Sequence, residues 1–276
     1  MSKTSTITIK PFLKWAGGKY RIVNKILNEL PHGDRLVEPF AGSAAVYLNA
    51  SFEFSLICDI NKDLIGLYRT LQEEGDDFIQ YCKSFFTPAN NTKDKFYALR
   101  EQFSFVQDIR TRGALLLYLN RHAFNGLVRY NSKGKFNVPF GQYKKPYFPL
   151  DELRAFHRKT ICTHTEFVVK DFRKIFAELR LGDVVYCDPP YVPLSATSSF
   201  TTYAGNVFDE TDQRDLAELA SDAWRRGIQV ILSNHDTEGT RALYSAATIR
   251  SLEVQRFISC NGNKRGVAPE LLAIYR

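Results

Sequence analysis

Short apolar runs alternate with longer amphipathic stretches along most of the chain, and this pattern predicts strands alternating with helices. The apolar runs predict strands at Arg35–Glu38, Ser55–Cys58, Asp183–Cys187 and Gln229–Ser233. Helical periodicity covers Tyr20–Leu30, Asp63–Lys83, Arg110–Leu119 and Asp212–Arg225. A closing β-hairpin is predicted from the last two runs, Ser251–Ile258 and Glu270–Arg276, around the loop Asn261–Gly266. Such alternation is typical of an α/β fold with a doubly wound, mostly parallel sheet.

The strands are unevenly spaced, and this spacing predicts an insertion in the sheet domain. Across residues 62–148 the pattern is helical and then loop-like, with few alternating runs. We therefore expect residues 62–148 to form an inserted, mainly helical subdomain. Residues 1–61 and 149–276 are expected to form one discontinuous sheet domain, in which the sheet resumes near Phe167.

The run Asp188-Pro189-Pro190-Tyr191 directly follows a predicted buried strand. Open α/β sheets bind their ligands at the carboxyl ends of strands. The two prolines end the strand and fix a turn, which directs the Pro189 carbonyl outward as an acceptor. Asp188 supplies a second acceptor and Tyr191 a flat surface, so the run suits a planar ring bearing an exocyclic amino group. For these four residues alone, a simple strand-ending turn is the alternative.

A second predicted strand leads into a turn of small residues, Ala41 to Ala45, in which Gly42 is the one glycine. Small residues let a ligand approach the backbone closely. The turn lacks the G-x-G-x-x-G spacing of dinucleotide sites, and the glycines near Lys19 lack the spacing of a phosphate-binding loop. A nucleoside is therefore a better candidate ligand than a nucleotide.

Three further side chains are candidates for the same ligand. Asp59 ends the next strand and is placed either to bond ribose hydroxyls or to cap the helix that starts at Asn61. Trp15 is suited to stack on an adenine and Lys19 to meet a carboxylate. A buried Trp beside a solvated Lys is the alternative for that pair.

The overall charge favours a polyanionic partner, because the net charge is +7 and the pI is about 9.1. The five cysteines are scattered, with no C-x-x-C spacing, which predicts reduced thiols, no structural zinc and a cytosolic compartment. No apolar run approaches the length that spans a membrane, and the first ten residues are polar, so we expect no membrane association.

Seven motifs lie in order over nearly the whole chain: FLKWAGGKY (12–20), VEPFAGS (37–43), DIN (59–61), NRHAFNGLVRYN (120–131), FNVPFGQYKKPYFP (136–149), VVYCDPPYVPLSAT (184–197) and SNHDT (233–237). Together they resemble the Dam-type DNA adenine methylases, which are AdoMet-dependent N6-adenine methyltransferases. The order of cofactor motif, recognition insert and catalytic motif is that of the α group of this family.

The resemblance implies the AdoMet-dependent methyltransferase fold, S-adenosyl-L-methionine as the methyl donor and no metal. It also implies which residues contact the donor. These are the residues that match the family's donor contacts, together with those of the cofactor turn: Trp15, Lys19, Phe40, Gly42, Asp59 and Asp188. Residues 188–191 would hold an adenine flipped out of the duplex.

The chemistry of adenine N6 fits these residues. The lone pair on N6 is delocalised into the ring, so N6 is a poor nucleophile. Bonds from its two hydrogens to Asp188 and to the Pro189 carbonyl would favour a pyramidal nitrogen and localise the lone pair. The methyl group of a sulfonium is already activated, so direct transfer needs positioning and electrostatics rather than a covalent enzyme intermediate.

The segment 119–149 has the composition of a nucleic-acid reader, with six basic residues, seven aromatic residues and no Asp or Glu. A solvated basic loop is the weaker alternative. The resemblance implies that Arg129 pairs with a guanine, that Leu127 and Pro139 touch a thymine methyl, and that Lys14 reaches the outer guanine. The remaining DNA-binding candidates are Phe124, Asn125, Tyr143 and Lys144. Of these, Phe124 and Asn125 would lie beside the flipped base.

Three residues depart from the family pattern. Phe124 stands where relatives often have Tyr, Gln142 replaces a common Arg, and Ala44 replaces a frequent second glycine of the cofactor turn. The basic loop 261–265 is read either as a phosphate grip or as a solvated hairpin tip. Ser233-Asn234-His235-Asp236 has the residue types of a hydrolytic triad, but consecutive residues do not readily converge, so we interpret it as a turn near the active site.

The sequence therefore predicts an enzyme that methylates adenine N6 in double-stranded DNA within GATC. We expect a monomer that acts in the cytoplasm of a bacterial or phage-infected cell. The alternatives are an RNA adenine methyltransferase and a catalytically inactive DNA-binding relative. An A-form major groove would not admit such a recognition insert, which disfavours RNA.

Overall fold

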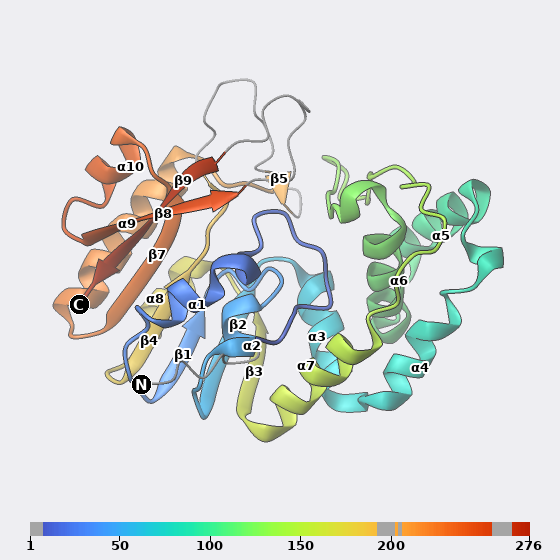
Figure 1. Ribbon diagram of the computed structural model, residues 1–276, viewed down its shortest axis with the longest axis horizontal. Coiled ribbons are helices and arrows are strands. Elements are labelled where there is room, and N and C mark those ends of the chain that lie inside the picture. Colours follow the sequence, from blue (N-terminus) through green and yellow to red (C-terminus); the bar gives the residue numbers. More distant parts are fainter. Residues whose placement is uncertain (1–7, 192–201, 204–205, 256–266) are drawn as a thin grey trace.

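The structure is a computed structural model that describes residues 8–191, 202–203, 206–255 and 267–276 of the 276-residue chain. Its centre is a seven-stranded sheet in the order β3-β2-β1-β4-β7-β9-β8 (Figure 1). The strands are β1 (Arg35–Glu38), β2 (Phe54–Asp59), β3 (His164–Val169), β4 (Asp183–Cys187), β7 (Gln229–His235), β8 (Thr248–Gln255) and β9 (Val267–Tyr275).

Strands β3, β2, β1, β4 and β7 are mutually parallel, whereas β9 runs antiparallel to both β7 and β8. The predicted doubly wound, mostly parallel sheet is confirmed, as are the four predicted strands and the return of the sheet near Phe167. The closing hairpin is confirmed as β8–β9, although its predicted loop lies outside the described residues. A short pair, β5 (Thr202–Tyr203) and β6 (Asn206–Val207), stands apart from the sheet.

The sheet is buried on both faces, and successive residues of its central strands face opposite sides. On β1, for example, Leu36 packs into one core cluster and Val37 into the other. The first face is covered mainly by α1 (Val23–Leu27), α2 (Ala45–Asn49), α3 (Lys62–Glu74) and α7 (Leu150–Cys162). The second face is covered by α8 (Phe172–Ala177) and α9 (Glu210–Arg225), and α10 (Glu238–Leu243) lies near β7.

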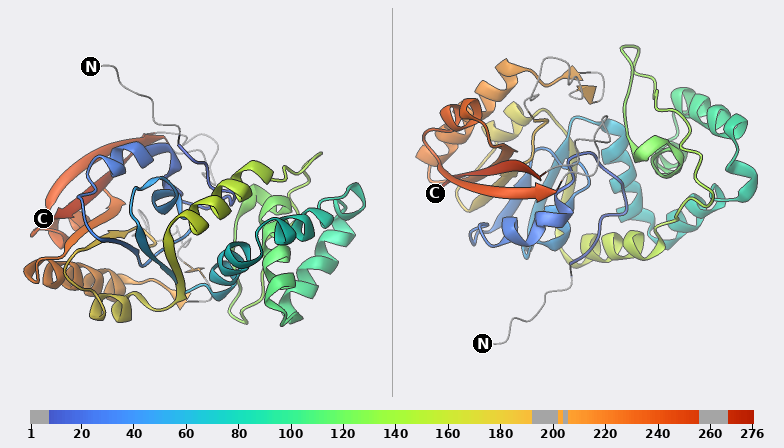
Figure 2. Two further views of the ribbon diagram at one scale, coloured as in Figure 1. Left: turned by 90° about the horizontal axis from the view of Figure 1, so that it is seen from below. Right: turned by 45° about the horizontal axis from the view of Figure 1, so that its top comes forward.

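Further helices stand beside the sheet rather than on it, as Figure 1 and the two views of Figure 2 show. They are α4 (Asp76–Ser84), η2 (Pro88–Asn90), α5 (Lys93–Phe105) and α6 (Ile109–His122). Most of α6 is buried, from Gly113 to its end. The irregular segment 123–149, which contains the turn η3 (Phe124–Gly126), follows α6 and leads into α7.

Two predicted helices are wrong in extent. The helix expected at 63–83 is two helices, α3 and α4, because Gly75 between them has φ +55°, a conformation that only glycine adopts easily. The helix expected at 20–30 is a 3-10 turn, η1 (Lys19–Ile22), followed by the short α1. The predictions at 110–119 and 212–225 are confirmed as α6 and α9, each slightly longer than expected.

Candidate active site

Polar residues gather at the carboxyl ends of the parallel strands. Glu38 ends β1, Asp59 ends β2, Asp188 directly follows β4, and Ser233 lies near the end of β7. The strand order reverses between β1 and β4, and open α/β sheets bind ligands at such a switch point. Asp59 and Asp188, which the sequence analysis identified in separate motifs, therefore lie at one edge of the sheet.

The Asp188 carboxylate is held by two donors from distant parts of the chain. The Lys19 Nζ lies 2.9 Å from Asp188 Oδ1, and the Ser233 hydroxyl donates to the same oxygen at 2.9 Å. Lys19 Nζ also donates to the Gly17 carbonyl at 2.5 Å. Lys19 is only 4% exposed, so the interpretation of a solvated lysine is wrong. The turn predicted at residues 233–236 is wrong, because β7 continues to His235, and Ser233 lies within that strand beside Asp188.

Tyr191, the last residue of the D-P-P-Y run, is held on three sides. Its hydroxyl donates to Glu270 Oε2 at 2.9 Å, and Lys19 Nζ lies 4.6 Å from its ring centroid. The His235 ring packs edge-on against it, with centroids 4.6 Å apart. Burial, followed by the charge of Asp188, raises the Tyr191 pKa well above its ordinary value.

The middle of the run is fixed as well. Pro189 is buried, and the Pro190 carbonyl accepts from Gln213 Nε2 of α9 at 2.7 Å. The Gln213 Oε1 in turn accepts from Asn234 Nδ2 at 3.1 Å. The run is therefore a preorganised turn held by buried side chains of four other elements, η1, β7, α9 and β9.

The small-residue turn brings Trp15 and Asp59 together. Gly42 has φ +45°, and a Cβ there would lie 3.0 Å from the Trp15 Nε1, so a side chain would collide with the indole. The Gly42 amide donates to Asp59 Oδ2 at 3.1 Å, and the Asn61 amide donates to Asp59 Oδ1 at 2.9 Å. The Tyr68 hydroxyl donates to the Gly42 carbonyl at 2.6 Å.

Asp59 is not the cap of the following helix. The cap of α3 is Asn61, whose side chain accepts from the amides of Asp63 and Leu64. Asp59 instead fixes the small-residue turn, and burial raises its pKa to about 6 despite backbone bonds that lower it. Phe40, on the same turn, packs against the rings of Phe172 and Phe208 and remains partly exposed.

Glu38 is a site residue that the sequence pattern did not reveal. It is 2% exposed, and its Oε1 has no hydrogen-bond partner within the described part of the chain. Burial raises its pKa to about 8; an accepted bond from the Tyr47 backbone lowers it, and the charge of Asp188 raises it further. It lies within the VEPFAGS motif and ends a strand before the small-residue turn, but neither signal shows that its side chain is buried without a partner for Oε1.

The segment 123–149 presents the predicted DNA-binding residues on a folded loop. The Phe124 amide donates to the Pro139 carbonyl at 2.9 Å, and the Asn137 amide donates to the Arg129 carbonyl at 3.0 Å. The Arg129 Nε donates to Asn137 Oδ1 at 2.8 Å. The loop exposes the side chains of Phe124, Asn125, Arg129, Pro139 and Lys144, and partly buries those of Leu127 and Tyr143.

Asn120 joins this loop to the N-terminal segment. Its Nδ2 donates to the carbonyls of Lys14 and Gly126 at 2.7 and 2.8 Å, and its Oδ1 accepts from the Lys14 amide at 3.0 Å. Lys14 Nζ lies 4.6 Å from the Tyr143 ring. Burial, followed by the charge of Arg121, lowers the Lys14 pKa. Lys14 and the loop residues are thus held as one surface, through an asparagine that gave no separate signal.

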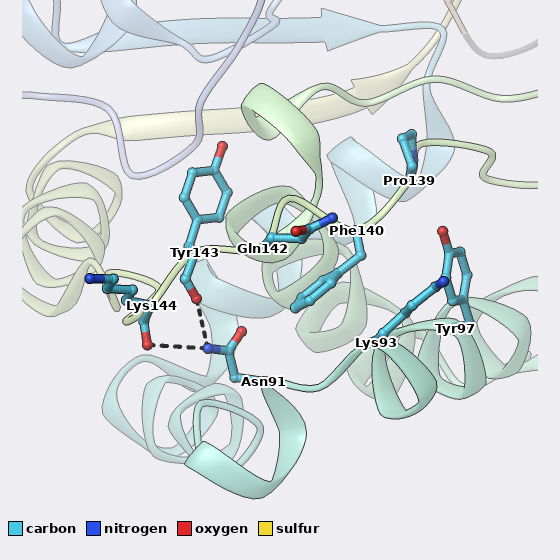
Figure 3. Close-up of a pocket in the computed structure, with 8 residues that line it drawn as sticks. All are labelled: Asn91, Lys93, Tyr97, Pro139, Phe140, Gln142, Tyr143 and Lys144. Atoms are coloured by element: carbon cyan, nitrogen blue, oxygen red, sulfur yellow. Dashed lines mark hydrogen bonds between the residues drawn. The ribbon is translucent and has the colours of Figure 1, made fainter.

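A pocket of about 660 Å³ lies on the same loop, between it and α5 (Figure 3). Asn91 anchors the loop here, because its Nδ2 donates to the carbonyls of Tyr143 and Lys144 at 2.8 and 3.4 Å. The pocket is lined by Asn91, Lys93, Tyr97, Pro139, Phe140, Gln142, Tyr143 and Lys144.

The strand order and a cofactor turn without phosphate-binding glycines define the class as an α/β enzyme with the AdoMet-dependent methyltransferase fold. The model of the D12 class N6 adenine-specific DNA methyltransferases matches residues 15–258, and the chain belongs to this family. It is therefore an adenine-N6-specific DNA methyltransferase, and a methyltransferase of this family requires a methyl donor of the AdoMet type.

Three relatives are DNA adenine methylases that match nearly end to end. The enzyme of Vibrio cholerae is 48% identical over 96% of this chain and 96% of its own. That of Serratia marcescens is 47% identical over 97% and 98%, and that of Escherichia coli K12 is 46% identical over 97% and 95%. Among solved structures, the C-terminal domain of precorrin-6Y C5,15-methyltransferase from Rhodobacter capsulatus aligns at a TM-score of 0.41 with 12% identity, covering 100% of this chain and 99% of that one.

The described residues include no helix long and apolar enough to cross a membrane. In the same part of the chain, no three His, Cys, Asp or Glu side chains are grouped to hold a metal ion.

Proposed function

We propose that this enzyme transfers the methyl group of S-adenosyl-L-methionine to N6 of adenine within GATC in double-stranded DNA. The observation that carries the proposal is the preorganised D-P-P-Y turn. Its acceptor, Asp188, and its ring, Tyr191, are fixed side by side around one buried ammonium, that of Lys19. The adenine leaves the stack, and Tyr191 replaces a lost stacking neighbour, a contact worth about 1–3 kcal/mol per base.

The residues at the strand ends fit the methyl donor. Because Gly42 has no side chain, a space is left between its backbone and the Trp15 indole, which a Cβ would fill. Asp59 lies beside this space, where it accepts from the Gly42 amide. The unpartnered Oε1 of Glu38 is a buried polar atom at the same edge of the sheet. We assign Trp15, Phe40, Gly42 and Asp59 to the nucleoside part of the donor. Lys19 is assigned to its carboxylate.

The donor supplies a methyl group on a positively charged sulfur, and the protein supplies geometry and charge. Both bonds to Asp188 fall on Oδ1, so Oδ2 is the oxygen we assign to one N6 hydrogen. The Pro189 carbonyl is assigned to the other. As the bond from N6 to the methyl carbon forms, the carbon–sulfur bond would break and leave a neutral thioether, so the positive charge passes to N6. The Asp188 carboxylate stabilises that charge until N6 releases one of its protons.

A covalent enzyme intermediate is unnecessary. The nearest cysteine in sequence, Cys187, is buried, and burial raises the pKa of its thiol well above the ordinary value. A thiol held neutral in this way is a poor nucleophile. Direct transfer from the donor to N6 is the reaction that the site supports.

The segment 123–149 is proposed to read the DNA. We assign Arg129 to a guanine, Leu127 and Pro139 to a thymine methyl, and Lys14 to the outer guanine. Phe124 and Asn125 are assigned to the space that the flipped adenine leaves. Tyr143 and Lys144 are assigned to the flanking DNA.

The wider assignments follow from this function. We propose that residues 62–148 serve as the recognition subdomain, and that residues 1–61 and 149–276 form the catalytic domain. The enzyme is proposed to act as a monomer on chromosomal or phage DNA in the cytoplasm of a bacterial or phage-infected cell.

The proposal is tested with Asp188→Ala. This change removes the assigned acceptor of an N6 hydrogen and the partner of Lys19, so methyl transfer should be lost while binding of a GATC duplex is retained. Labelled methyl transfer and an equilibrium DNA-binding titration measure the two effects. Turnover near that of the unaltered enzyme would contradict the role of Asp188.

A further inference from the structure

Glu270 is a buried acid that no sequence motif singles out. It lies on β9, paired in register with His235 of β7 and Leu252 of β8, and it is 7% exposed. Burying a carboxylate is costly unless partners compensate it, so its surroundings are informative. The Tyr191 hydroxyl donates to Oε2 at 2.9 Å, and Lys19 Nζ lies 4.0 Å from the same oxygen.

We propose that Glu270 is a positioning residue for methyl transfer, which acts by fixing Tyr191 and by sharing the ammonium of Lys19 with Asp188. This inference rests on the proposed function, because it assigns Tyr191 to the adenine. The first end of the D-P-P-Y run is held through Asp188 and the middle through the Pro190 carbonyl. Glu270 fixes the remaining end.

The hydrogen bond to Glu270 fixes the position of the Tyr191 ring, which stacking alone would allow to slide. A hydrogen bond at the para-hydroxyl anchors the far end of the ring to a strand of the sheet. The His235 edge contact and the Lys19 ammonium, each 4.6 Å from the ring centroid of Tyr191, hold its other sides. An adenine stacked on this ring would therefore be held at a set distance from the Asp188 carboxylate, on which the rate of transfer depends steeply.

The charges at this point favour the same assignment. Lys19 carries one positive charge, and it lies 2.9 Å from one carboxylate and 4.0 Å from the other. Two carboxyl groups therefore lie around one ammonium group. A fixed negative charge beside Tyr191 stabilises the positive charge that develops on N6 during transfer.

The test compares Glu270→Ala, Glu270→Gln and Tyr191→Phe in the full-length enzyme. Glu270→Ala removes the bond and the charge, and the expected result is a single-turnover transfer rate lower by roughly 10–100-fold, with a smaller change in DNA affinity. Glu270→Gln keeps an acceptor for the hydroxyl but loses the charge, so its rate should fall between that of Glu270→Ala and that of the unaltered enzyme. Glu253→Gln is the matched control, because Glu253 is exposed on β8 of the same hairpin.

A spectroscopic readout separates positioning from general destabilisation. With 2-aminopurine in place of the target adenine, stacking on Tyr191 quenches the fluorescence of the flipped base. Glu270→Ala and Tyr191→Phe should both give a brighter complex. Combining them should cost little more than the larger single change, because both remove one hydrogen bond.

Two results would overturn the inference. One is an unaltered transfer rate and fluorescence in Glu270→Ala, and the other is full additivity between Glu270→Ala and Tyr191→Phe. If Glu270→Ala does not fold, the isosteric Glu270→Gln decides instead, and a rate equal to that of Glu253→Gln would refute the charge role. Failure of the unaltered enzyme to methylate any GATC duplex would instead refute the proposed function.

Discussion

At the scale of single residues, the site depends on side chains whose partners lie far away in sequence. Asp188 and Tyr191 were predictable because they are adjacent to a strand end within one short run. Lys19, Ser233 and Glu270, which hold them, come from the N-terminal turn and from two later strands. Their pairing depends on the tertiary fold, so no local pattern revealed it.

Arg129→Ala should relax sequence choice rather than weaken binding to all DNA. Its Nε is bonded to Asn137, and we assign its two terminal nitrogens to the guanine edge. Loss of such a bidentate contact costs about 1–3 kcal/mol of discrimination at one base pair. Competition binding with GATC and single-substitution duplexes measures it. Lys144 is assigned to the flanking DNA, so Lys144→Ala should weaken binding to all of these duplexes alike. The same uniform loss in Arg129→Ala would argue against base readout.

Ala44→Gly should cost less stability than Ala45→Gly. Ala44 caps α2 with φ 56° and ψ 33°, a left-handed conformation that costs an alanine about 1–2 kcal/mol. Glycine relieves this strain, but it adds about 0.4–1 kcal/mol of unfolded-state entropy and loses a buried methyl group worth about 0.8 kcal/mol. The net change in the free energy of unfolding should therefore lie within about 1 kcal/mol of zero in denaturant unfolding. Ala45→Gly loses a buried methyl group without any relief of strain, so it should destabilise clearly, and equal losses in both variants would contradict the strain.

At the scale of elements, periodicity predicted the four central strands and the two longest helices well. It failed where a helix is short or broken. The helix α2 spans five residues directly after a tight turn, too few for a periodic signal, and α3 and α4 were read as one helix through Gly75. The missed α5 has a weakly amphipathic sequence, and its buried residues contact α6 rather than the sheet. The proposed subdomain bounds stay a prediction.

Gly75→Ala should destabilise the junction between α3 and α4. Gly75 has φ +55° and ψ −125°, a region closed to other residues, and a Cβ would lie 2.5 Å from the His157 ring. The expected loss is about 2 kcal/mol or more in denaturant unfolding. Gly66→Ala is the matched control, since Gly66 is helical and its Cβ would meet Ile109 at an ordinary 3.4 Å. A similar effect of both changes would argue against the backbone strain.

At the scale of the whole molecule, the fold brings Glu38, Asp59 and Asp188 to one edge of the sheet, and burial raises the pKa of the first two. Sequence showed the positions of Asp59 and Asp188 at strand ends, but it did not show how deeply Glu38 and Asp59 are buried. That depth depends on how Trp15, α2 and α3 cover the edge. Their pKa values, about 8 and about 6, are therefore properties of the fold.

Glu38 should make stability fall as the pH rises. Its pKa is raised from 4.5 to about 8, so the folded state binds this proton more tightly than the unfolded chain does. The stability that this bound proton contributes is complete below pH 4.5, the pKa of Glu38 in the unfolded chain, and it is lost as the pH rises to about 8. Glu38→Gln removes this dependence, so its stability relative to the unaltered enzyme should improve by up to about 1.4 kcal/mol per pH unit.

Unfolding in denaturant at a series of pH values from about 5 to 8 measures this difference. Glu53→Gln, at an exposed position, is the control and should follow the unaltered enzyme. Parallel profiles for Glu38→Gln and the unaltered enzyme would show that Glu38 does not titrate in this range.

The most direct test of the central claim is methyl transfer from labelled S-adenosyl-L-methionine to a duplex with one GATC site. A scrambled duplex and an RNA version are the comparisons. Label on adenine N6 of the GATC duplex alone is the predicted result. Equal labelling of the scrambled duplex would contradict the specificity assigned to Arg129, Leu127 and Pro139. DNA binding without label in any substrate would contradict the proposed catalysis itself.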